Sequence, residues 1–327
     1  MTSGLLSYEE ISDLISQRIK ELALPDEPEN LYEPMRYMLG LGGKRLRPLL
    51  AVMSHNLFDD NIANAIPPAL AIELFHNFTL VHDDIMDNAP LRRGHETVYK
   101  KWSTNVAILS GDALLVKAYE LLSQSDLAVQ PRLLQAFNQT ALQVCEGQQL
   151  DMDFESRSLT CKGVSEKEYL HMIKLKTAVL FGLSLQFGAF TAGQDEAVAH
   201  QLYEAGIHLG LAFQLQDDLL DVYAGDGFGK QTGGDIINAK KTCLLVKTLE
   251  QATLEDKRKL ATILRTKSRQ PQRKIEAVMA IYEKYGVEAY TADRIKAHLA
   301  DFRQAITGLQ TGREQNLLNL IDQLAGR

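Results

Sequence analysis

Cysteine is scarce in this chain of 327 residues, and the three that occur do not form a recognisable set. They stand far apart in the sequence, at Cys145, Cys161 and Cys243. An odd and scattered set excludes a disulfide framework, and the lack of a Cys-x-x-Cys pair excludes a cysteine zinc site. We therefore expect reduced thiols in a cytoplasmic protein.

Long apolar runs and an excess of basic residues are also missing. No run approaches the roughly 18 apolar residues that a membrane-spanning helix needs, and the start lacks the basic and apolar regions of a signal peptide. Lysine and arginine number 35 against 42 acidic residues, which gives a formal net charge of −7. A nucleic-acid-binding protein has the opposite balance. The composition predicts a protein with no integral membrane segment and no nucleic-acid partner.

Strand patterns are absent as well, because no stretch alternates with period two or carries a β-branched run between turn signals. Apolar residues instead recur at helical spacing, and a hydrophobic content of 45% is ample for a core. These patterns predict an all-α protein. The expected helices lie near residues 5–22, 31–39, 46–58, 66–87, 104–125, 131–156, 165–192, 195–224, 235–251, 253–266, 271–284, 287–308 and 313–325.

The most informative pattern of charge lies at the end of the helix predicted over residues 66–87. Asp83 and Asp87 stand four residues apart and would share one face of that helix. Like charges at this spacing repel unless a cation lies between them, and oxygen ligands alone suit Mg²⁺. A single motif of this kind could equally be an acidic helix end that faces water. A second copy, at Asp217, Asp218 and Asp221, favours the metal site.

Seven cations accompany the two aspartate motifs. Three glycines in the segment 40–43 allow close approach of the backbone, and a lysine follows at once. The cations that stand in glycine-rich loops or interrupt apolar helices are Lys44, Arg47, Arg92, Arg93, Lys176, Lys230 and Lys240. Carboxylates together with these cations describe a site for two polyanionic groups, one held through metal ions and one held directly. Diphosphates match that description.

The motifs, taken in order, resemble those of the trans-isoprenyl diphosphate synthases of the polyprenyl synthetase family. The matching segments are GGKRLRP at 42–48, HDDIMDNAPLRRG at 82–94, KT at 176–177, FQLQDDLLD at 213–221, GK at 229–230, GGDI at 233–236 and KKT at 240–242. They cover most of residues 40–245. The resemblance implies a single domain over residues 1–327, built as one large bundle of about ten or more helices around a central prenyl-diphosphate cavity.

The resemblance also implies ligands for two substrates and for Mg²⁺, with three ions expected. The metal ligands it implies are Asp83, Asp87, Asp217 and Asp221. The ligands of isopentenyl diphosphate would be Lys44, Arg47, His76 and Arg93, and those of the allylic diphosphate would be Arg92, Lys176, Thr177, Gln214, Lys230 and Lys240. The catalytic set would be Asp83, Asp84, Asp87, Asp217, Asp218, Lys176 and Lys230.

Simpler interpretations exist for several of these residues. From the sequence alone His76 is by default a buried or interface histidine, and Lys176 and Lys240 are ordinary solvated charges of a helix. Thr177 and Gln214 are by default hydrogen-bonding residues of the core. The order and spacing of the motifs favour the functional interpretation for all of them together.

The activity implied by the resemblance is the Mg²⁺-dependent, head-to-tail condensation of isopentenyl diphosphate with an allylic diphosphate. Metal ions and cations would stabilise the charge that develops on the leaving diphosphate, which then takes the proton. The family is usually a homodimer. Two alternatives stay open: a class I terpene cyclase, which typically lacks the second aspartate motif, and a non-catalytic subunit of a heteromeric synthase, in which these motifs commonly erode.

One residue offers a clue to product length. Phe78 precedes Asp83 by five residues, so on a helix it lies about 7 to 8 Å from the metal site, where a ring could close the prenyl tunnel. By default it is one more core aromatic. In the family this position resembles a length-setting site, and the small Thr79 with an uninterrupted DDIMD resembles synthases that make the C20 product geranylgeranyl diphosphate, with C15 farnesyl diphosphate next. The facing helix from Ala113 to Ala118 is the other candidate region.

Overall fold

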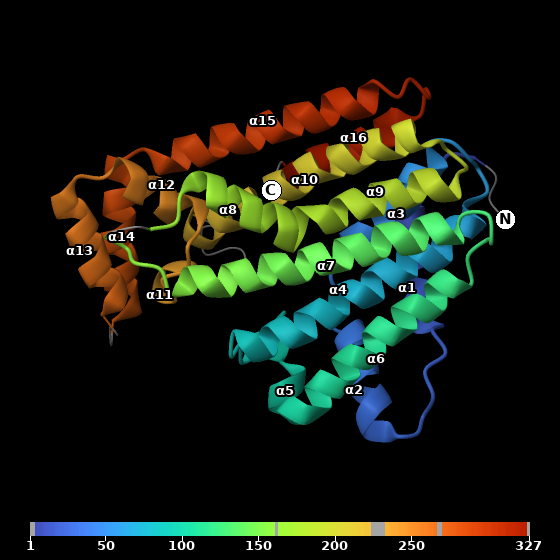
Figure 1. The fold of residues 1–327 in the computed structure, drawn as a ribbon, viewed down its shortest axis with the longest axis horizontal. Coiled ribbons are helices and arrows are strands. Elements are labelled where there is room, and N and C mark those ends of the chain that lie inside the picture. Colours follow the sequence, from blue (N-terminus) through green and yellow to red (C-terminus); the bar gives the residue numbers. More distant parts are fainter. Residues whose placement is uncertain (1–3, 161–162, 224–232, 267–269, 326–327) are drawn as a thin grey trace. The chain divides into compact units, whose positions relative to one another are not determined.

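The structure is a computed structural model that describes residues 4–160, 163–223, 233–266 and 270–325. Within these ranges it is almost entirely helical, so the all-α prediction is confirmed (Figure 1). The chain divides into two compact units. Residues 1–138, 183–203 and 306–327 form unit 1, and residues 139–182 and 204–305 form unit 2. A single domain over the whole chain stays a prediction.

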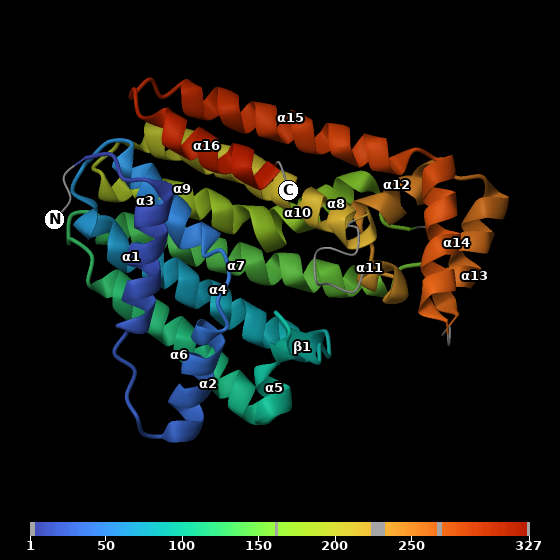
Figure 2. The ribbon, with the colours of Figure 1, turned by 180° about the vertical axis from the view of Figure 1, so that it is seen from behind.

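Unit 1 is organised around α4, which lies beside α6 and also contacts α3 (Figure 2). Prolines in the first turn of α4 suit a position where no backbone N–H is needed. The stretch 68–75 of α4 is fully buried, and the helix becomes partly exposed from Phe78 towards its C-terminal end. The elements that lie wholly in unit 1 are α1 (Tyr8–Lys20), α2 (Glu29–Gly40), α3 (Leu46–Asn56), the 3₁₀ helix η1 (Ile62–Ala65), α4 (Ile66–Met86), β1 (Leu91–Arg92), β2 (His95–Glu96), α5 (Val98–Lys101), α6 (Thr104–Ser123) and α16 (Glu314–Ala325).

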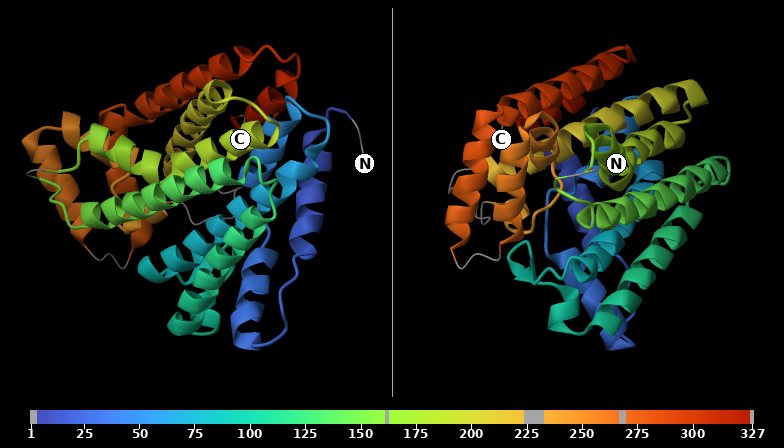
Figure 3. Two further views of the ribbon diagram at one scale, coloured as in Figure 1. Left: turned by 45° about the vertical axis from the view of Figure 1, so that its right-hand side comes forward. Right: turned by 60° about the vertical axis from the view of Figure 1, so that its left-hand side comes forward.

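Unit 2 has its own apolar core, in which Leu244, Val278 and Tyr282 are almost fully buried. The elements that lie wholly in unit 2 are α8 (Glu166–Ile173), the π-helical turn η2 (Lys174–Ala178), α11 (Gly234–Ile237), α12 (Cys243–Gln251), α13 (Leu254–Arg265) and α14 (Pro271–Lys284). Four helices contribute residues to both units: α7 (Gln130–Glu155), α9 (Val179–Thr191), α10 (Glu196–Tyr223) and α15 (Val287–Thr307). Within unit 2, α15 runs alongside α10 (Figure 3).

The helix predicted over residues 165–192 is interrupted by a π-helical turn. Its start is a capping box, in which Ser165 and Glu168 bond each other's backbone N–H groups. The π turn then adds a wider loop of backbone at Lys174–Ala178, between α8 and α9. The segment Glu166–Thr191 is the one candidate membrane span among the described residues, and 83% of its apolar window is buried, as in the core helix of a globular protein.

Two other expectations from the sequence were wrong. The helix predicted over residues 235–251 is two helices, α11 and α12, because Ala239 adopts a left-handed φ of 53° and Thr242 caps the start of α12. The exclusion of strands misses the small antiparallel hairpin of β1 and β2. Its turn residues Arg93 and Gly94 have φ values of 52° and 79°, which is the backbone of a type I′ turn.

Candidate active site

The first aspartate motif lies at the C-terminal end of α4, in unit 1. Asp83 is partly exposed, and Asp87, which ends the helix, is exposed. Asp84 is 1% exposed, and Arg92 donates from Nε to both of its carboxylate oxygens at 2.9 Å. Burial raises the pKa of Asp84, although the bonds from Arg92 oppose the shift. The middle carboxylate thus holds the hairpin against α4, while the outer two reach the surface.

Arginines of the segment 42–48 lie against the buried part of α4. Glu73, 2% exposed, forms an ion pair with Arg45 and accepts a hydrogen bond of 2.8 Å from Asn77. Arg47 Nη1 lies 3.1 Å from His76 Nε2. Because a guanidinium can only donate, His76 Nε2 accepts this bond and the ring proton is on Nδ1.

The electrostatics of this arginine cluster favour an anion. Burial and then the nearby arginines keep the pKa of His76 well below its usual value, so its ring is neutral. Burial lowers the pKa of Arg47 to about 10, which leaves it charged at neutral pH. Two buried carboxylates, Glu73 and Asp84, face four guanidinium groups, so positive charge is in excess. The four are Arg45, Arg47, Arg92 and Arg93.

The glycine loop receives the side chain of Arg93. The type I′ turn directs this residue back towards the loop, where its guanidinium donates to the carbonyl of Gly42. A Cβ on Gly43, whose φ is 118°, would lie 2.8 Å from the guanidinium carbon of Arg93. This φ disfavours any residue other than glycine, and a Cβ here would also displace the Arg93 side chain. The sequence predicted that an anion can approach this loop. In the structure the loop also contacts Arg93, one of the cations predicted to bind that anion.

Phe78 and Thr79 are partly exposed on α4, before the aspartates. The Phe78 ring packs against Phe75 at a centroid distance of 5.6 Å and against His82 at 4.8 Å. Thr79 donates its hydroxyl to a backbone carbonyl of α4 at 2.8 Å. A Cβ on Gly111 of α6 would lie 2.4 Å from the His82 ring, so this glycine provides the space for His82.

The second aspartate motif lies on α10, in unit 2, and its middle residue is again the buried one. Asp218 is 4% exposed and accepts three hydrogen bonds from neutral groups. They come from the Tyr169 hydroxyl, from the backbone N–H of Cys243 at 2.9 Å and from the Gln214 amide at 3.0 Å. Burial raises the pKa of Asp218, and the three bonds oppose the shift. The residue therefore joins α8, α10 and the start of α12.

The outer carboxylates of this motif lie closer to the surface. Asp217 is exposed, whereas Asp221 is partly buried and accepts the backbone N–H of Asp235 at 2.9 Å. Burial raises the pKa of Asp235 to about 7, although the positive charge of Lys240 opposes the shift. Lys240 itself is exposed. Lys230, which the sequence placed in the site, lies outside the described residues.

The π turn carries Lys176 and Thr177. Lys176 Nζ lies 2.6 Å from a carboxylate oxygen of Asp151 on α7, and Thr177 donates to Gln214 at 3.0 Å. A Cβ on Gly147 would lie 2.2 Å from the backbone nitrogen of Lys176, so the π turn packs directly on α7. The backbone of this turn, and not only its side chains, is therefore specified by the neighbouring helix.

Sequence reasoning missed the partners that position these residues. They are Glu73, His82, Gly111, Gly147, Asp151, Tyr169 and Asp235. A signal existed for Glu73, which is a single acid in an apolar run, and for Gly147 and Asp151, which stand one helical turn apart. Tyr169 gave no signal, because its importance depends on which carboxylate it meets. Two groups of predicted site residues are joined by hydrogen bonds in the structure. One group is Thr177, Gln214 and Asp218, and the other is the pair Arg47 and His76.

Comparison with known proteins decides the family. The family model of polyprenyl synthetases matches residues 28–282, which is well over half of the chain. The chain belongs to the polyprenyl synthetase family. This membership confirms the resemblance of the motifs and makes the protein a trans-prenyltransferase.

Relatives of this polyprenyl synthetase carry related names. A geranylgeranyl pyrophosphate synthase of Geoglobus acetivorans is 43% identical over 241 residues, which cover 73% of this chain and 74% of the relative. A geranylgeranyl diphosphate synthase of Saccharolobus solfataricus is 38% identical, with 90% of this chain and 88% of the relative covered. A crystal structure of a geranylgeranyl pyrophosphate synthase superposes with a TM-score of 0.93 at 42% identity, covering 98% of this chain and 99% of that one. These relatives do not favour a terpene cyclase or a non-catalytic subunit.

Proposed function

We propose that this prenyltransferase condenses isopentenyl diphosphate head to tail with an allylic diphosphate and makes mainly the C20 product, geranylgeranyl diphosphate. Enzymes of the family generally depend on Mg²⁺ and use these two classes of substrate. The observation that carries the proposal is the excess of guanidinium groups over carboxylates around His76, since it suits a diphosphate bound directly. The names of the relatives support the C20 product, with C15 farnesyl diphosphate as the second candidate.

Isopentenyl diphosphate is assigned to the cations of unit 1. Its ligands in this proposal are Lys44, Arg47, His76 and Arg93. Arg47 retains its charge, and the neutral Nδ1–H of His76 is a donor that a phosphate oxygen can accept. Burial of Arg47 strengthens its attraction for an anion, because water screens the charge less there.

Mg²⁺ is assigned to the outer carboxylates of the two motifs, with three ions in all. The ligands in this proposal are Asp83, Asp87, Asp217 and Asp221. Their donor set fits the ion, because carboxylate oxygens that reach the surface leave room for the waters and phosphate oxygens that Mg²⁺ retains. The middle residues, Asp84 and Asp218, support the site by fixing the helix ends that carry these ligands. When bound, the ions stabilise the charge of the leaving diphosphate.

The allylic diphosphate is assigned to the second group of polar residues. They are Arg92, Lys176, Thr177, Gln214, Lys230 and Lys240. The ion pair with Asp151 and the bond from Thr177 to Gln214 hold these side chains in place before substrate binds. Preorganised cations act on the bond between the allylic carbon and the diphosphate oxygen, because they stabilise charge where it develops. The double bond of isopentenyl diphosphate then attacks the allylic cation, and the released diphosphate takes the proton.

Chain length is assigned to Phe78 and Thr79. Phe78 is held by Phe75 and His82, so its ring is a fixed obstacle rather than a mobile one. Replacing it in Phe78→Ala should lengthen the main product by at least one five-carbon unit, while the matched variant Phe75→Leu should leave the length unchanged. If the Phe78→Ala product spectrum equals that of the parent, the stretch from Ala113 to Ala118 on α6 becomes the better candidate.

We also propose a cytoplasmic homodimer in which the chain acts as a single domain. Supporting the dimer, α6 exposes large apolar side chains, among which Leu109 and Val116 are 62% and 65% exposed and stand seven residues apart on one face. Such a face is typical of a subunit interface. Sedimentation of the protein and of Val116→Glu would test this, because the variant should shift towards monomer.

The central experiment supplies purified protein with Mg²⁺, labelled isopentenyl diphosphate and each short allylic primer, and sizes the products by chromatography. We expect condensation with the allylic primers and a main product of C20. Chelation of Mg²⁺ should abolish it. No product from any primer, with protein shown to be folded, would overturn the proposed reaction, and a main product of another length would overturn only the assignment of chain length.

A further inference from the structure

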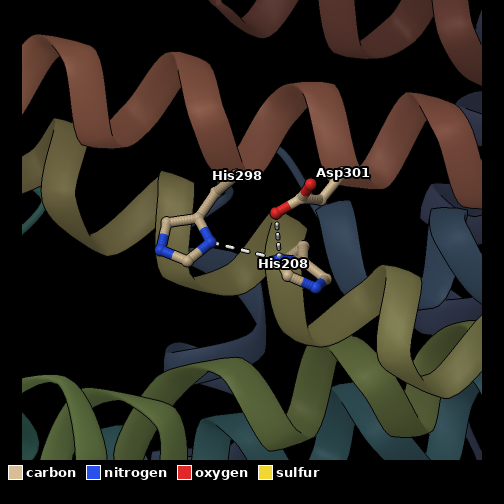
Figure 4. Close-up of side chains that lie close together, drawn as sticks. All are labelled: His208, His298 and Asp301. Carbon is tan, nitrogen blue, oxygen red and sulfur yellow. Dashed lines mark hydrogen bonds and ion pairs between the residues drawn. The ribbon is translucent and has the colours of Figure 1, made fainter.

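Two histidines and an aspartate meet between α10 and α15, within unit 2 (Figure 4). His208 comes from α10, while His298 and Asp301 are three residues apart on α15 and so share one face of it. The Nδ1 atoms of the two imidazoles lie 3.1 Å apart, and His208 Nδ1 lies 3.4 Å from a carboxylate oxygen of Asp301. The proposed function uses none of the three.

The distances in this cluster match those between the ligands of a small metal ion. Bonds of 2.0–2.2 Å at tetrahedral angles place neighbouring ligand atoms about 3.3 to 3.5 Å apart. The two measured separations are 3.1 Å and 3.4 Å, and all three ligand atoms lie within 4.8 Å of one another. The third separation, between His298 and Asp301, is therefore at most 4.8 Å.

We propose that His208, His298 and Asp301 bind one Zn²⁺ ion, at a site separate from that of the catalytic Mg²⁺. Two imidazole nitrogens and one carboxylate are ligands that Zn²⁺ accepts, whereas Mg²⁺ prefers oxygen alone. The Asp301 side chain is 54% exposed, so solvent can reach the cluster and supply the fourth ligand. His208 precedes Asp217 by nine residues on the same helix, which places it about 13 Å away.

The bound ion would link α10 to α15, because its ligands come from both helices. Because α10 carries the second aspartate motif near its C-terminal end, this link would stabilise the helix that presents Asp217 and Asp221. Binding to the folded state alone stabilises a protein according to how far the ligand concentration exceeds its dissociation constant. Zn²⁺ should therefore raise the melting temperature without being needed for prenyl transfer.

The test measures the binding of Zn²⁺ and of Co²⁺, whose visible spectrum reports tetrahedral coordination, in a large excess of Mg²⁺ that occupies oxygen-only sites. The parent should bind one ion with an intense visible Co²⁺ band and show a rise in melting temperature with Zn²⁺. His298→Ala and Asp301→Asn should weaken binding by about 100-fold or more and 10-fold or more respectively, because each loses a direct ligand.

The matched control is His200→Ala, which removes an exposed histidine from the same helix. It should bind both ions as the parent does. Melting curves without metal would verify that every variant is folded. Equal affinity and an unchanged Co²⁺ spectrum in folded His298→Ala and Asp301→Asn would overturn the proposed site, whatever the outcome of the prenyltransferase assay.

Discussion

The two aspartate motifs share one spacing but rest on different chemistry. In the first, the buried Asp84 faces the guanidinium of Arg92, and further arginines pair with Glu73 and His76. In the second, Asp218 accepts bonds from a hydroxyl, an amide and a backbone N–H, all of them neutral. Burial raises the pKa of both middle carboxylates. The middle carboxylate of the same short pattern is thus bonded by a charged guanidinium in unit 1 and by neutral donors in unit 2.

This difference indicates a division of labour. Guanidinium groups in excess favour an anion that binds the protein directly, as proposed for isopentenyl diphosphate. Neutral donors around Asp218 stabilise its carboxylate without adding positive charge of their own to this end of α10. A negative helix end is what a divalent cation requires.

The largest effect on turnover is expected from the outer aspartates of the two motifs. We expect this effect to be the same in both motifs. Asp83→Asn and Asp217→Asn should each lower turnover by several orders of magnitude, because each removes a charge that balances Mg²⁺. Both side chains are at least partly exposed, so circular dichroism should show an intact fold. Near-normal turnover in either folded variant would contradict the metal assignment.

The next effect separates the two substrates. Arg47→Ala should raise the KM for isopentenyl diphosphate by about 10- to 100-fold, since a hydrogen bond to a charged group contributes about 1.5–3 kcal/mol. Lys240→Ala is the matched variant of the other region, and it should raise the KM for the allylic substrate instead. Steady-state kinetics with each substrate varied in turn would measure this. The opposite pattern would mean that the two diphosphate assignments are exchanged.

A smaller effect, on the free energy of unfolding, is expected at the middle aspartates Asp84 and Asp218. Asp84→Asn should lower the free energy of unfolding by about 2 kcal/mol, because it leaves the partly buried charge of Arg92 without its partner. Asp218→Asn should lower the free energy of unfolding by only about 1 kcal/mol, because the donors that lose an acceptor are all neutral. Denaturant titrations at low and high salt should show that only the first cost decreases with salt. If the two variants lost the same free energy of unfolding with the same salt dependence, the proposed difference between a charged partner for Asp84 and neutral partners for Asp218 would be wrong.

The smallest effect is on the pH dependence of stability, and it is expected only from His76 in the arginine cluster of unit 1. The pKa of His76 is lower in the folded protein than the usual 6.5, so below that pH the unfolded chain takes up a proton that the folded one does not. This group should therefore reduce stability as the pH falls below 6.5, by at most about 1.4 kcal/mol per pH unit. His76→Gln, which keeps an acceptor for Arg47, should flatten the curve of stability against pH.

Much of the fold was predictable from periodicity and capping. The long helix that ends at the first motif, the capping box at Ser165 and the glycine loop before α3 all follow from local sequence. The π turn at Lys176 was not predictable, because it depends on the close approach that Gly147 allows on a neighbouring helix. The break between α11 and α12 was missed for a similar reason, since Asp218 of α10 accepts the first N–H of α12.

The sequence by itself determined the all-α class, the family and the residue types of the site, because helical period and motif order are properties of the chain alone. Only the tertiary structure decided which aspartate of each motif is buried and what it pairs with. It also decided that Arg93 returns to the glycine loop and that His208 meets His298 and Asp301. Burial and pairing depend on residues far apart in the sequence, and the free energy of a charged group is set by those neighbours rather than by its own motif.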